Sequence, residues 1–561
     1  MAGGAATEGR TVAQSFRRDP GGWTVRRSPA LAALAARRGE WAGRTVADDA
    51  RALAAADPDR LHLIDGDLAL SRGQIHDRAL RLAGWFDALG LAPGSVVSFQ
   101  LPNWWEAAVV DLAAAMTGLV VNPVVPIYRE AEVRFMLGEA RSRVVFAPGV
   151  FRGFDHAAMM GRILPDLPEE AVLVTARARL GGALCLDDLL SGPRLAAPRK
   201  VDSDAVKLLM YTSGTTGRPK GVLHSHNTLS ADSLKMCRAM GLGTGDRTFS
   251  PSPLTHVSGY LWALTAPWTC GVPVVTTDVW DAGAAFDAIC RHGCSFMLGA
   301  TPFLQDLVAE AARRGETLET LRFFLCGGAS VPPGLIREAA QRFPNCVPFR
   351  VFGATEVPTM TAGPASRAGL DLAAETDGRL LGCEVRLVHP ETGEPVADGE
   401  EGEILAREPS MALGYARPED NEEAYDADGF FRTGDLGRLV HGDHIVCTGR
   451  KKDLIIRAGE NISAREIEDV LFRSPRIAEA AVVAMPSART GEAVCAFVVP
   501  AGEEAVDLAH VAALVGAAGL ARQKTPERVI PVAELPKTAS GKVRKDILRG
   551  MAAASREEET A

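Results

Sequence analysis

The chain has 561 residues, of which 47% are hydrophobic and 23% charged, and its formal net charge is −9. A single hydrophobic core stops growing well before this length, so we expect at least two domains. The composition is ordinary for a soluble globular protein and fits neither a disordered nor a fibrous chain. The acidic balance argues against a general nucleic-acid binder, although local basic clusters can still meet an anionic ligand.

Cysteine usage and apolar patterning predict a soluble cytoplasmic protein. The ten cysteines are scattered without a framework, which is typical of reduced thiols. Cys290 and Cys294 flank His292, but structural zinc needs four ligands, so we expect a helix end followed by a turn. The first 22 residues lack the apolar core of a signal peptide. Residues 107–127 are apolar, but an aspartate, an asparagine and two prolines interrupt them. This favours a buried helix running into a strand over stable membrane insertion.

The chain divides into three predicted parts. Residues 1–45 are rich in Gly, Arg and Ala and are expected to form a loosely ordered N-terminal arm. Residues 46–451 alternate apolar strand-like runs with amphipathic helical stretches, which predicts helix-covered parallel sheets of the α/β class. The strand-like runs are SVVSFQL, RVVFAPG, AVLVTA, VKLLMYTS, PVVTT, FMLGA and RFFLCGG. Near Gly402 the segments GEILARE and GRLVHGDHIVCTGR predict a small antiparallel lobe or barrel.

Residues 452–561 predict a compact α+β unit of ordinary domain size. ISAREIEDVLFRS and VDLAHVAALVGAAGLA have helical spacing, while AEAAVVAMP and AVCAFVVP are strand-like. No internal repeat is found, and no phosphopantetheine-carrier segment follows this unit.

The stretch YTSGTTGRPKGV, residues 211–222, combines three glycines, five hydroxyl-bearing residues and one lysine. A strand is predicted before it and a helix, SHNTLSADSLKMCRAM, after it, and such a junction exposes amides that favour an anion. The glycines permit the dihedral angles that let N–H groups converge on phosphate oxygens. The spacing is not that of a Walker A loop, because Pro219 precedes Lys220 and Gly221 follows it. The composition alone also fits a flexible surface loop.

The full string resembles the signature of the adenylate-forming enzymes, which include acyl-CoA and aryl-CoA synthetases, peptide-synthetase adenylation domains and firefly luciferase. Five further motifs resemble those of this family in the same order, and together they span about Arg60 to Arg549. They are LCGGAS (325–330), VFGATEVP (351–358), FRTGDLGRL (431–439), GRKKDLIIRAGENISAREIE (449–468) and PKTASGKVRKDILR (536–549). The resemblance implies a large multi-lobed N-terminal adenylation domain, with two helix-covered, mostly parallel sheets and a small β-barrel lobe. A small mobile α+β C-terminal domain would follow it.

The resemblance also implies a reaction in two halves. A carboxylate attacks the α-phosphate of ATP to give an acyl-adenylate and pyrophosphate, and the thiol of coenzyme A then displaces AMP. Charge that develops on phosphate oxygens needs donors and cations already in place. Lys542 is implied as the adenylation lysine, although in a basic tail it would otherwise be a surface charge. The β- and γ-phosphates would be held by Thr212, Ser213, Gly214, Thr215, Thr216, Gly217 and Lys220.

The middle motifs imply the remaining nucleotide contacts. Glu356 would ligate Mg²⁺, which prefers carboxylate, phosphate and water oxygens. Thr355 would contact the α-phosphate. Asp435 would accept both ribose hydroxyls, and Arg450 would support the ribose from the hinge side. The adenine would lie against Gly328, Ala329, Ser330, Phe352 and Gly353, and many relatives have tyrosine in place of this phenylalanine.

Lys452 occupies the hinge position, where the small domain of relatives rotates between the two half-reactions. Gly459 would pass close to the pantetheine arm of coenzyme A. Arg457, Arg465 and Lys524 are candidates for its phosphates, and a plain surface charge is the alternative for each.

His256, in PSPLTHVSGY (251–260), is implied as a catalytic residue that borders the acyl pocket, and a core histidine is the alternative. The segment HVSG has no carboxylate to hold an ammonium group, so α-amino acids are disfavoured. The rest of the implied lining is mostly apolar, which suits a bulky apolar acid. It consists of Val257, Ser258, Tyr260, Leu261, Trp262, Leu298, Gly299, Ala300, Thr301, Gly328 and Met360.

The segments LPNWWE and NPVVPIYRE are most similar to those of cyclohexanecarboxylate-CoA ligase-like enzymes and medium-chain acyl-CoA synthetases. Alicyclic, terpenoid, aryl and medium-chain acids remain open as substrates. The expected activity is that of a free-standing acid–CoA ligase, with ATP, Mg²⁺ and coenzyme A as cofactors. The alternative is an acyl-AMP ligase that loads a separate acyl carrier protein; Gly459 in its full motif favours coenzyme A.

Two further alternatives are a nucleotide binder without catalysis and a luciferase-type oxygenase. Retention of Lys542, Glu356 and Asp435 speaks against the first. The motifs do not exclude the second, which uses the same adenylation chemistry. A homodimer is left open.

Overall fold

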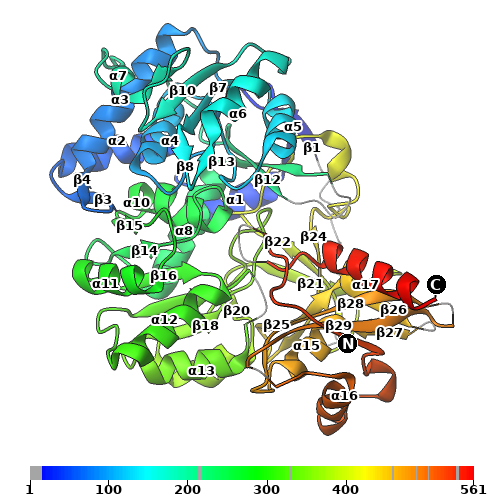
Figure 1. The fold of residues 1–561 in the computed structure, drawn as a ribbon. Coiled ribbons are helices and arrows are strands. Elements are labelled where there is room, and N and C mark those ends of the chain that lie inside the picture. Colours follow the sequence, from blue (N-terminus) through cyan, green and yellow to red (C-terminus); the bar gives the residue numbers. More distant parts are fainter. Residues whose placement is uncertain are drawn as a thin grey trace, which may run out of the picture.

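The computed structural model describes residues 15–560 except for 213–217, 329–330, 398, 458–459, 488, 503 and 539–541. In Figure 1 the blue and cyan part lies above the green part, and the orange and red C-terminal part lies beside the green part. Several predicted site residues lie outside the described residues, namely Ser213, Gly214, Thr215, Thr216, Gly217, Ala329, Ser330 and Gly459.

The first large sheet has eight strands and is parallel up to β12, as its apolar runs predict. Its order is β11 (Leu184–Cys185), β10 (Val172–Ala176), β7 (Ser142–Pro148), β5 (Val96–Phe99), β6 (Val120–Pro123), β12 (Val206–Thr212), β13 (Lys220–Ser225) and β23 (Gly414–Tyr415). α3 (Arg72–Ala88) precedes these strands in the chain, and the helices between them are α4 (Trp105–Thr117), α5 (Glu130–Ala140), α6 (His156–Ile163) and α7 (Leu186–Leu189). Residues 107–127 thus form most of α4 and then β6, a buried helix running into a strand as predicted.

The second large sheet has seven strands, all parallel except for the β3–β4 hairpin. Its order is β18 (Val347–Arg350), β17 (Phe323–Cys326), β16 (Phe296–Gly299), β14 (Thr248–Ser250), β15 (Val274–Thr276), β3 (Leu61–Asp65) and β4 (Leu68–Ser71). Its region contains α2 (Val46–Ala56), α8 (His226–Met240), α9 (Val257–Tyr260), α10 (Ala266–Thr269), α11 (Ala282–His292), α12 (Thr301–Arg314), α13 (Pro333–Arg342) and α14 (Leu370–Glu375). One hydrophobic core joins the two sheets, since Phe99 and Phe324 belong to the same buried cluster.

The setting of the glycine-rich loop differs from the expectation. β12 and β13 pair antiparallel, with Thr212 opposite Lys220, so the loop closes a hairpin. The helix begins only at His226, after a strand that is almost wholly buried. The prediction of a strand–helix junction was wrong because residues 220–225 form a further strand of the sheet before the helix begins.

The N-terminal segment also differs from the expectation of a loose arm, for the residues from Ser15 on. β1 (Ser15–Arg18) pairs with β2 (Thr24–Arg27), and α1 (Pro29–Arg38) follows. The backbone N–H of Val206 donates a 2.9 Å hydrogen bond to Asp19, which is buried. Buried contacts such as that of Asp19 therefore order this segment, although its composition is rich in Gly and Arg.

The predicted lobe of short antiparallel strands is a six-stranded antiparallel sheet. Its order is β19 (Thr361–Ala362), β20 (Arg379–Leu380), β25 (His444–Arg450), β24 (Phe431–Val440), β22 (Gly402–Arg407) and β21 (Glu384–Val388). The C-terminal end of β25 leads directly into the C-terminal domain.

The C-terminal domain has the predicted α+β composition. Its sheet contains β26 (Leu454–Arg457), β27 (Glu460–Ser463), β28 (Ile477–Ser487), β29 (Gly491–Pro500) and β30 (Arg528–Pro531). Its helices are α15 (Ala464–Leu471), α16 (Leu508–Ala517) and α17 (Lys545–Thr560). Separate apolar clusters lie on the two faces of this sheet, because side chains alternate along a strand.

The CRHGC segment is a helix end and a turn, as predicted. α11 ends at His292, and Gly293 follows with a φ of 60°.

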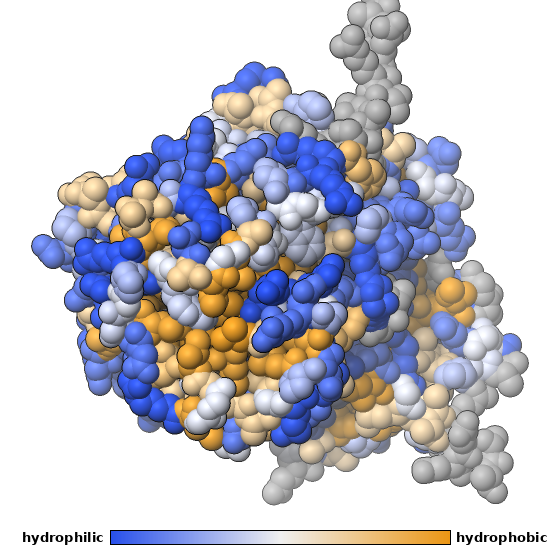
Figure 2. Space-filling model, turned by 90° about the horizontal axis from the view of Figure 1, so that it is seen from above, coloured by the Kyte–Doolittle hydropathy of each residue, from blue (hydrophilic) through white to orange (hydrophobic). Residues whose placement is uncertain are grey.

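Seen from above, one face of the molecule carries an apolar area bordered by polar side chains (Figure 2). Among the helices described, none is both long and apolar enough to cross a membrane.

Candidate active site

Lys542 reaches the N-terminal domain from a short hairpin of the C-terminal domain. The backbone N–H of Thr538 donates to the Lys542 carbonyl at 2.7 Å, and the Lys542 N–H donates to Thr538 Oγ1 at 3.1 Å. A Cβ placed on Gly328 would lie 3.8 Å from Lys542 Cε. The lysine therefore lies beside the turn after β17 that was predicted to line the adenine.

Several predicted site residues shift the pKa of Lys542. Burial lowers the pKa of Lys542, and the nearby Arg450 lowers it further. The carboxylates of Asp435 and Glu356 act in the opposite direction. Burial, with Lys542 nearby, also lowers the pKa of His256 to about 4, so this imidazole is neutral near pH 7. These five residues come from four separate motifs and from the acyl segment, and the fold brings them together.

Glu356 is buried and held at two atoms. The hydroxyl of Tyr415 donates to its Oε1 at 2.6 Å, and the backbone N–H of Ala412 donates to its carbonyl at 2.7 Å. Burial raises the pKa of Glu356, and the Tyr415 hydrogen bond opposes that shift. Thr355 precedes it, and its carbonyl accepts a 2.7 Å hydrogen bond from Nε2 of His224.

Lys220 lies close to the same tyrosine. Its Nζ is 5.2 Å from the centroid of the Tyr415 ring and 3.4 Å from Asp420 Oδ1. This contact follows from the sheet, because β23 pairs with β13 and sets Tyr415 opposite Val222. The lysine of the glycine-rich loop and the predicted magnesium ligand are thus linked through one side chain.

Asp435 and Arg450 form an ion pair of 2.8 Å across β24 and β25, where they are opposite each other in the register. The N–H of Asp435 donates to Thr433 Oγ1 at 3.1 Å, which orients the residue. Asp435 raises the pKa of Arg450. The pair therefore places the carboxylate of Asp435 near Lys542.

The turn at Phe352 and Gly353 is tightly packed. The N–H of Phe352 donates to Thr361 Oγ1 at 2.8 Å. A Cβ on Gly353 would lie only 1.9 Å from the carbonyl oxygen of Pro358, so no larger residue fits there. The half-buried ring of Phe352 remains available for stacking against a base.

The predicted acyl pocket is only partly accessible. Tyr260, Leu261, Trp262 and Met360 are at most 3% exposed and pack in hydrophobic cores. The Tyr260 hydroxyl contacts Asp111. Nζ of Lys207 donates a 2.5 Å hydrogen bond to the same hydroxyl. In this structure these four side chains pack in the core, as apolar residues commonly do, and their place in the lining of an acyl pocket stays a prediction.

The remaining predicted lining lies around the end of β16 and the start of α9. Thr301 and Gly299 are buried, and a Cβ on Gly299 would lie 2.7 Å from Cδ2 of Phe303. The accessible members of the set are His256, Val257, Ser258, Leu298, Ala300 and Gly328.

The three candidates for coenzyme A contacts all pair with carboxylates in this arrangement. Arg457 lies 2.7 Å from Glu527, Lys524 lies 2.6 Å from Glu466, and Arg465 lies 3.8 Å from Asp377. These pairings would have to open before the side chains could bind a phosphate.

Lys452 lies in a single turn of 3₁₀ helix, Lys451–Asp453. Its carbonyl accepts a 3.4 Å hydrogen bond from Nη2 of Arg549, and the same guanidinium contacts the carboxylate of Asp453. The predicted hinge is therefore held by α17, which belongs to the C-terminal domain.

The donor set suits a magnesium ion that arrives with a nucleotide. Within the described parts of the chain, no group of three or more His, Cys, Asp or Glu side chains is placed to hold a metal. Mg²⁺ in nucleotide enzymes is commonly held by one or two carboxylates together with phosphate oxygens and water. Glu356 can supply such a carboxylate.

Sequence reasoning missed Tyr415 and His224. Both are bonded to the 355–356 segment, but Tyr415 is 59 residues and His224 131 residues away from its partner. No spacing rule connects such positions. His224 lies on β13 and Tyr415 on β23, and these paired strands both run beside the 355–356 segment.

Known proteins are similar to this chain in fold and in sequence. Residues 50–416 match the family described as AMP-binding enzyme, and residues 466–542 match the AMP-binding enzyme C-terminal domain. The chain is 35% identical over 524 residues to the medium-chain fatty-acid–CoA ligase of Escherichia coli strain K12, with 91% of each chain covered. It is 34% identical over 501 residues to the sulfoacetate–CoA ligase of Cupriavidus necator, with 87% of this chain and 94% of the relative covered. The crystal structure of ATP-bound MatB from Rhodopseudomonas palustris superposes with a TM-score of 0.81 at 27% identity, with 91% of this chain and 99% of MatB covered.

Proposed function

Because this chain belongs to the AMP-binding enzyme family, we propose that it is an AMP-forming acid–CoA ligase whose acid is bulky and apolar. The observation that carries the proposal is the placement of Lys542 beside Glu356, Asp435 and Arg450. A lysine from the C-terminal domain among nucleotide-binding motifs of the N-terminal domain is the arrangement that acyl-adenylate formation needs.

The first half-reaction forms one bond and breaks one. A carboxylate oxygen of the acid bonds to the α-phosphorus of ATP, and the bond from that phosphorus to the bridging oxygen breaks, which releases pyrophosphate. Lys542 would donate hydrogen bonds to the acid and to an α-phosphate oxygen. Its charge would offset the charge that develops there.

Thr212 and Lys220 would hold the phosphates that leave, together with the loop between them. Thr355 would contact the α-phosphate, and Asp435 would orient the ribose. The carboxylate of Glu356 fits a Mg²⁺ ion, which when bound would neutralise charge on the phosphate oxygens.

In the second half-reaction the sulfur of coenzyme A bonds to the acyl carbon. The bond from that carbon to the AMP oxygen breaks, and the thiol proton goes to solvent. Lys542 has no role in this step, so the C-terminal domain would turn about Lys452 and bring Gly459 toward the pantetheine arm. We accordingly propose 46–451 and 452–561 as the two domains.

The neutral His256 and the apolar lining around it favour an acid without a second charge. The relatives' names include a medium-chain fatty acid and sulfoacetate, which differ sharply in polarity. Val257, Leu298 and Ala300 fit the first kind of acid better, since each presents hydrocarbon. We include cyclohexanecarboxylate and other alicyclic or aryl acids in the proposed range.

The test is pyrophosphate release across a panel of carboxylic acids, with and without coenzyme A. We expect medium-chain or alicyclic acids to give acyl-CoA and AMP only when coenzyme A is present. Lys542→Ala should lower pyrophosphate release by at least about 100-fold. Acyl-adenylate that forms but never transfers to coenzyme A would replace this proposal by the carrier-loading one. No pyrophosphate release with any acid would overturn it.

A further inference from the structure

We propose that Lys235 is a positioning residue for Glu356, because it joins two supports that hold the 355–359 segment. The inference rests on the proposed function, in which Glu356 is the magnesium ligand. Nothing in the sequence motifs points to Lys235, which lies outside all of them.

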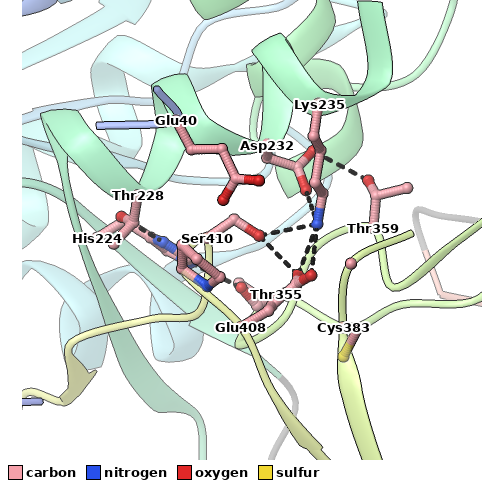
Figure 3. Close-up of polar contacts among 12 residues, drawn as sticks. Glu40, His224, Thr228, Asp232, Lys235, Thr355, Thr359, Cys383, Glu408 and Ser410 are labelled. Carbon is pink, nitrogen blue, oxygen red and sulfur yellow. Dashed lines mark hydrogen bonds and ion pairs between the residues drawn. The ribbon is translucent and has the colours of Figure 1, made fainter. Parts of the chain in front are cut away.

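Lys235 is the centre of a buried polar cluster on α8 and the segment after β22 (Figure 3). Its Nζ lies 2.7 Å from both carboxylate oxygens of Glu408, 2.9 Å from Ser410 Oγ and 3.2 Å from Asp232 Oδ1. The hydroxyl of Ser410 donates to Glu408 at 2.6 Å. The side chains of Asp232 and Glu408 are each 1% exposed, and that of Lys235 is 9% exposed.

The first support comes from one face of α8. Thr228, Asp232 and Lys235 are spaced by four and three residues, so they lie on the same side of the helix. Asp232 accepts a 3.0 Å hydrogen bond from the hydroxyl of Thr359. Thr228 Oγ1 lies 3.1 Å from Nδ1 of His224, whose other nitrogen donates to the Thr355 carbonyl at 2.7 Å. This helix face therefore holds both ends of the 355–359 segment.

The second support runs from Glu408 along the chain to Tyr415. Lys235 anchors Glu408 and Ser410 at the start of this stretch. The stretch then supplies the two donors to Glu356, the N–H of Ala412 and the hydroxyl of Tyr415. Lys235 is the residue that links this stretch to Asp232 and so to Thr359.

The charges of the cluster explain why one lysine is decisive. Burial by itself lowers the pKa of Lys235, but the carboxylates of Glu408 and Asp232 overcome this and raise it. One cation thus faces two buried carboxylates, and removing it would leave both unpaired. A buried ionic cluster contributes little net stability compared with apolar packing, but its fixed geometry can specify how segments are placed.

The decisive experiment measures metal binding directly. Titration of preformed Mn²⁺–ATP with the enzyme, followed by the enhancement of the water-proton relaxation rate over that of Mn²⁺–ATP alone, reports on the metal at the site without any acid or turnover. We expect Lys235→Met to weaken Mn²⁺ binding about tenfold, which corresponds to one charge-assisted hydrogen bond lost at the carboxylate. Glu356→Gln should abolish the same binding. The half-saturating Mg²⁺ concentration for pyrophosphate release should rise in parallel in Lys235→Met.

Two variants keep the proposal testable if Lys235→Met does not fold. Thr359→Val removes only the hydroxyl that donates a hydrogen bond to Asp232. Ser410→Ala removes one hydrogen-bond partner of Lys235. Each should weaken Mn²⁺ binding about threefold, which is about 0.7 kcal/mol. Thr248→Val is the matched control, because Thr248 is buried and its hydroxyl has no hydrogen-bond partner among the described atoms.

The outcomes separate the inference from the proposed function. Mn²⁺ binding of wild-type strength in folded Lys235→Met or Thr359→Val overturns the inference, whether or not an acid is found. A wild-type enzyme that binds Mn²⁺ with ATP but releases no pyrophosphate overturns the proposed function and leaves the inference to stand on the binding data. Transfer from preformed acyl-adenylate to coenzyme A should be unchanged in both variants, whereas a general loss of folding would lower it as well.

Discussion

The hydroxyl of Tyr415 donates a 2.6 Å hydrogen bond to Oε1 of Glu356. Tyr415 lies on β23, the last strand of the eight-stranded sheet, and Glu356 lies in the turn after β18 of the other large sheet. One hydrogen bond thus ties the proposed magnesium ligand to the sheet that carries the glycine-rich loop.

Tyr415→Phe should lower kcat/KM for ATP about tenfold, since a hydrogen bond to a charged group is worth about 1.5–3 kcal/mol. The ring near Lys220 is kept, so the change isolates the hydroxyl. Without this donor the pKa of Glu356, already raised by burial, should rise further and weaken its hold on a cation. Pyrophosphate release at varied ATP and fixed free Mg²⁺ measures the effect. An unchanged kcat/KM would remove Tyr415 from the site.

Lys452→Pro should separate the two half-reactions. Proline fixes φ at about −65°, and a 3₁₀ turn such as Lys451–Asp453 has an ideal φ of about −50 to −70°, so adenylation should persist within a few-fold. Rotation about the same residue would be blocked, so transfer of the acyl group to coenzyme A should fall by at least about 100-fold. Acyl-adenylate formation and acyl-CoA formation are measured separately.

Lys452→Ala is the control for the proline substitution, because it removes the same side chain and leaves φ free. It should support both half-reactions. If Lys452→Pro also supports both at wild-type rates, the hinge assignment is wrong.

The fold class was predictable because strand and helix periodicities are local. The strands β5, β7, β10, β12, β15, β16 and β17 all coincide with apolar runs read from the sequence. The C-terminal helices α15 and α16 coincide with the two segments whose spacing is helical. The hairpin at the glycine-rich loop was not predictable in this way, since only Val222 and Leu223 of β13 are apolar and a helix follows the strand directly.

The polar contacts within the site depend on tertiary pairing and left no local signal. Tyr260 illustrates the difficulty, because it stands four residues after His256 and resembles a pocket residue. Its hydroxyl instead contacts Asp111, 149 residues away, and Lys207. Sequence motifs were enough to propose a nucleotide site, whereas the partners of each side chain required the fold.

Replacing a single member of the buried triad of Lys207, Asp111 and Tyr260 should lower the free energy of unfolding. Lys207 and Asp111 form a 2.7 Å ion pair with side chains only 1% and 3% exposed. Lys207→Met would leave the carboxylate of Asp111 unpaired and should destabilise the protein by about 3–5 kcal/mol. The midpoint of thermal unfolding at a fixed scan rate records the loss.

The double variant Asp111→Leu/Lys207→Met tests the cause of this loss. Replacing both charges with apolar groups removes the unpaired carboxylate, so most of the lost stability should return. A double variant as unstable as Lys207→Met alone would show that packing around the pair, and not its charge, is responsible.

The buried histidines should make the protein sensitive to mild acid. Burial lowers the pKa of His62 to about 3 and of His156 and His224 to about 4. In the unfolded chain each would bind a proton near pH 6.5, so between that pH and the folded value the unfolded state binds more protons. Stability is therefore full above about pH 6.5 and falls with decreasing pH, by at most about 1.4 kcal/mol per pH unit for each histidine.

His62→Phe isolates one of these contributions. The ring of His62 stacks on Trp268 with centroids 3.7 Å apart, and its Nε2 has no hydrogen-bond partner among the described atoms. Phenylalanine keeps the stack, cannot be protonated and has no polar ring atom to leave without a partner. The urea midpoint measured at about pH 7 and about pH 5 should fall less in this variant than in the wild type. An equal fall in both proteins would mean that His62 does not contribute to the acid sensitivity.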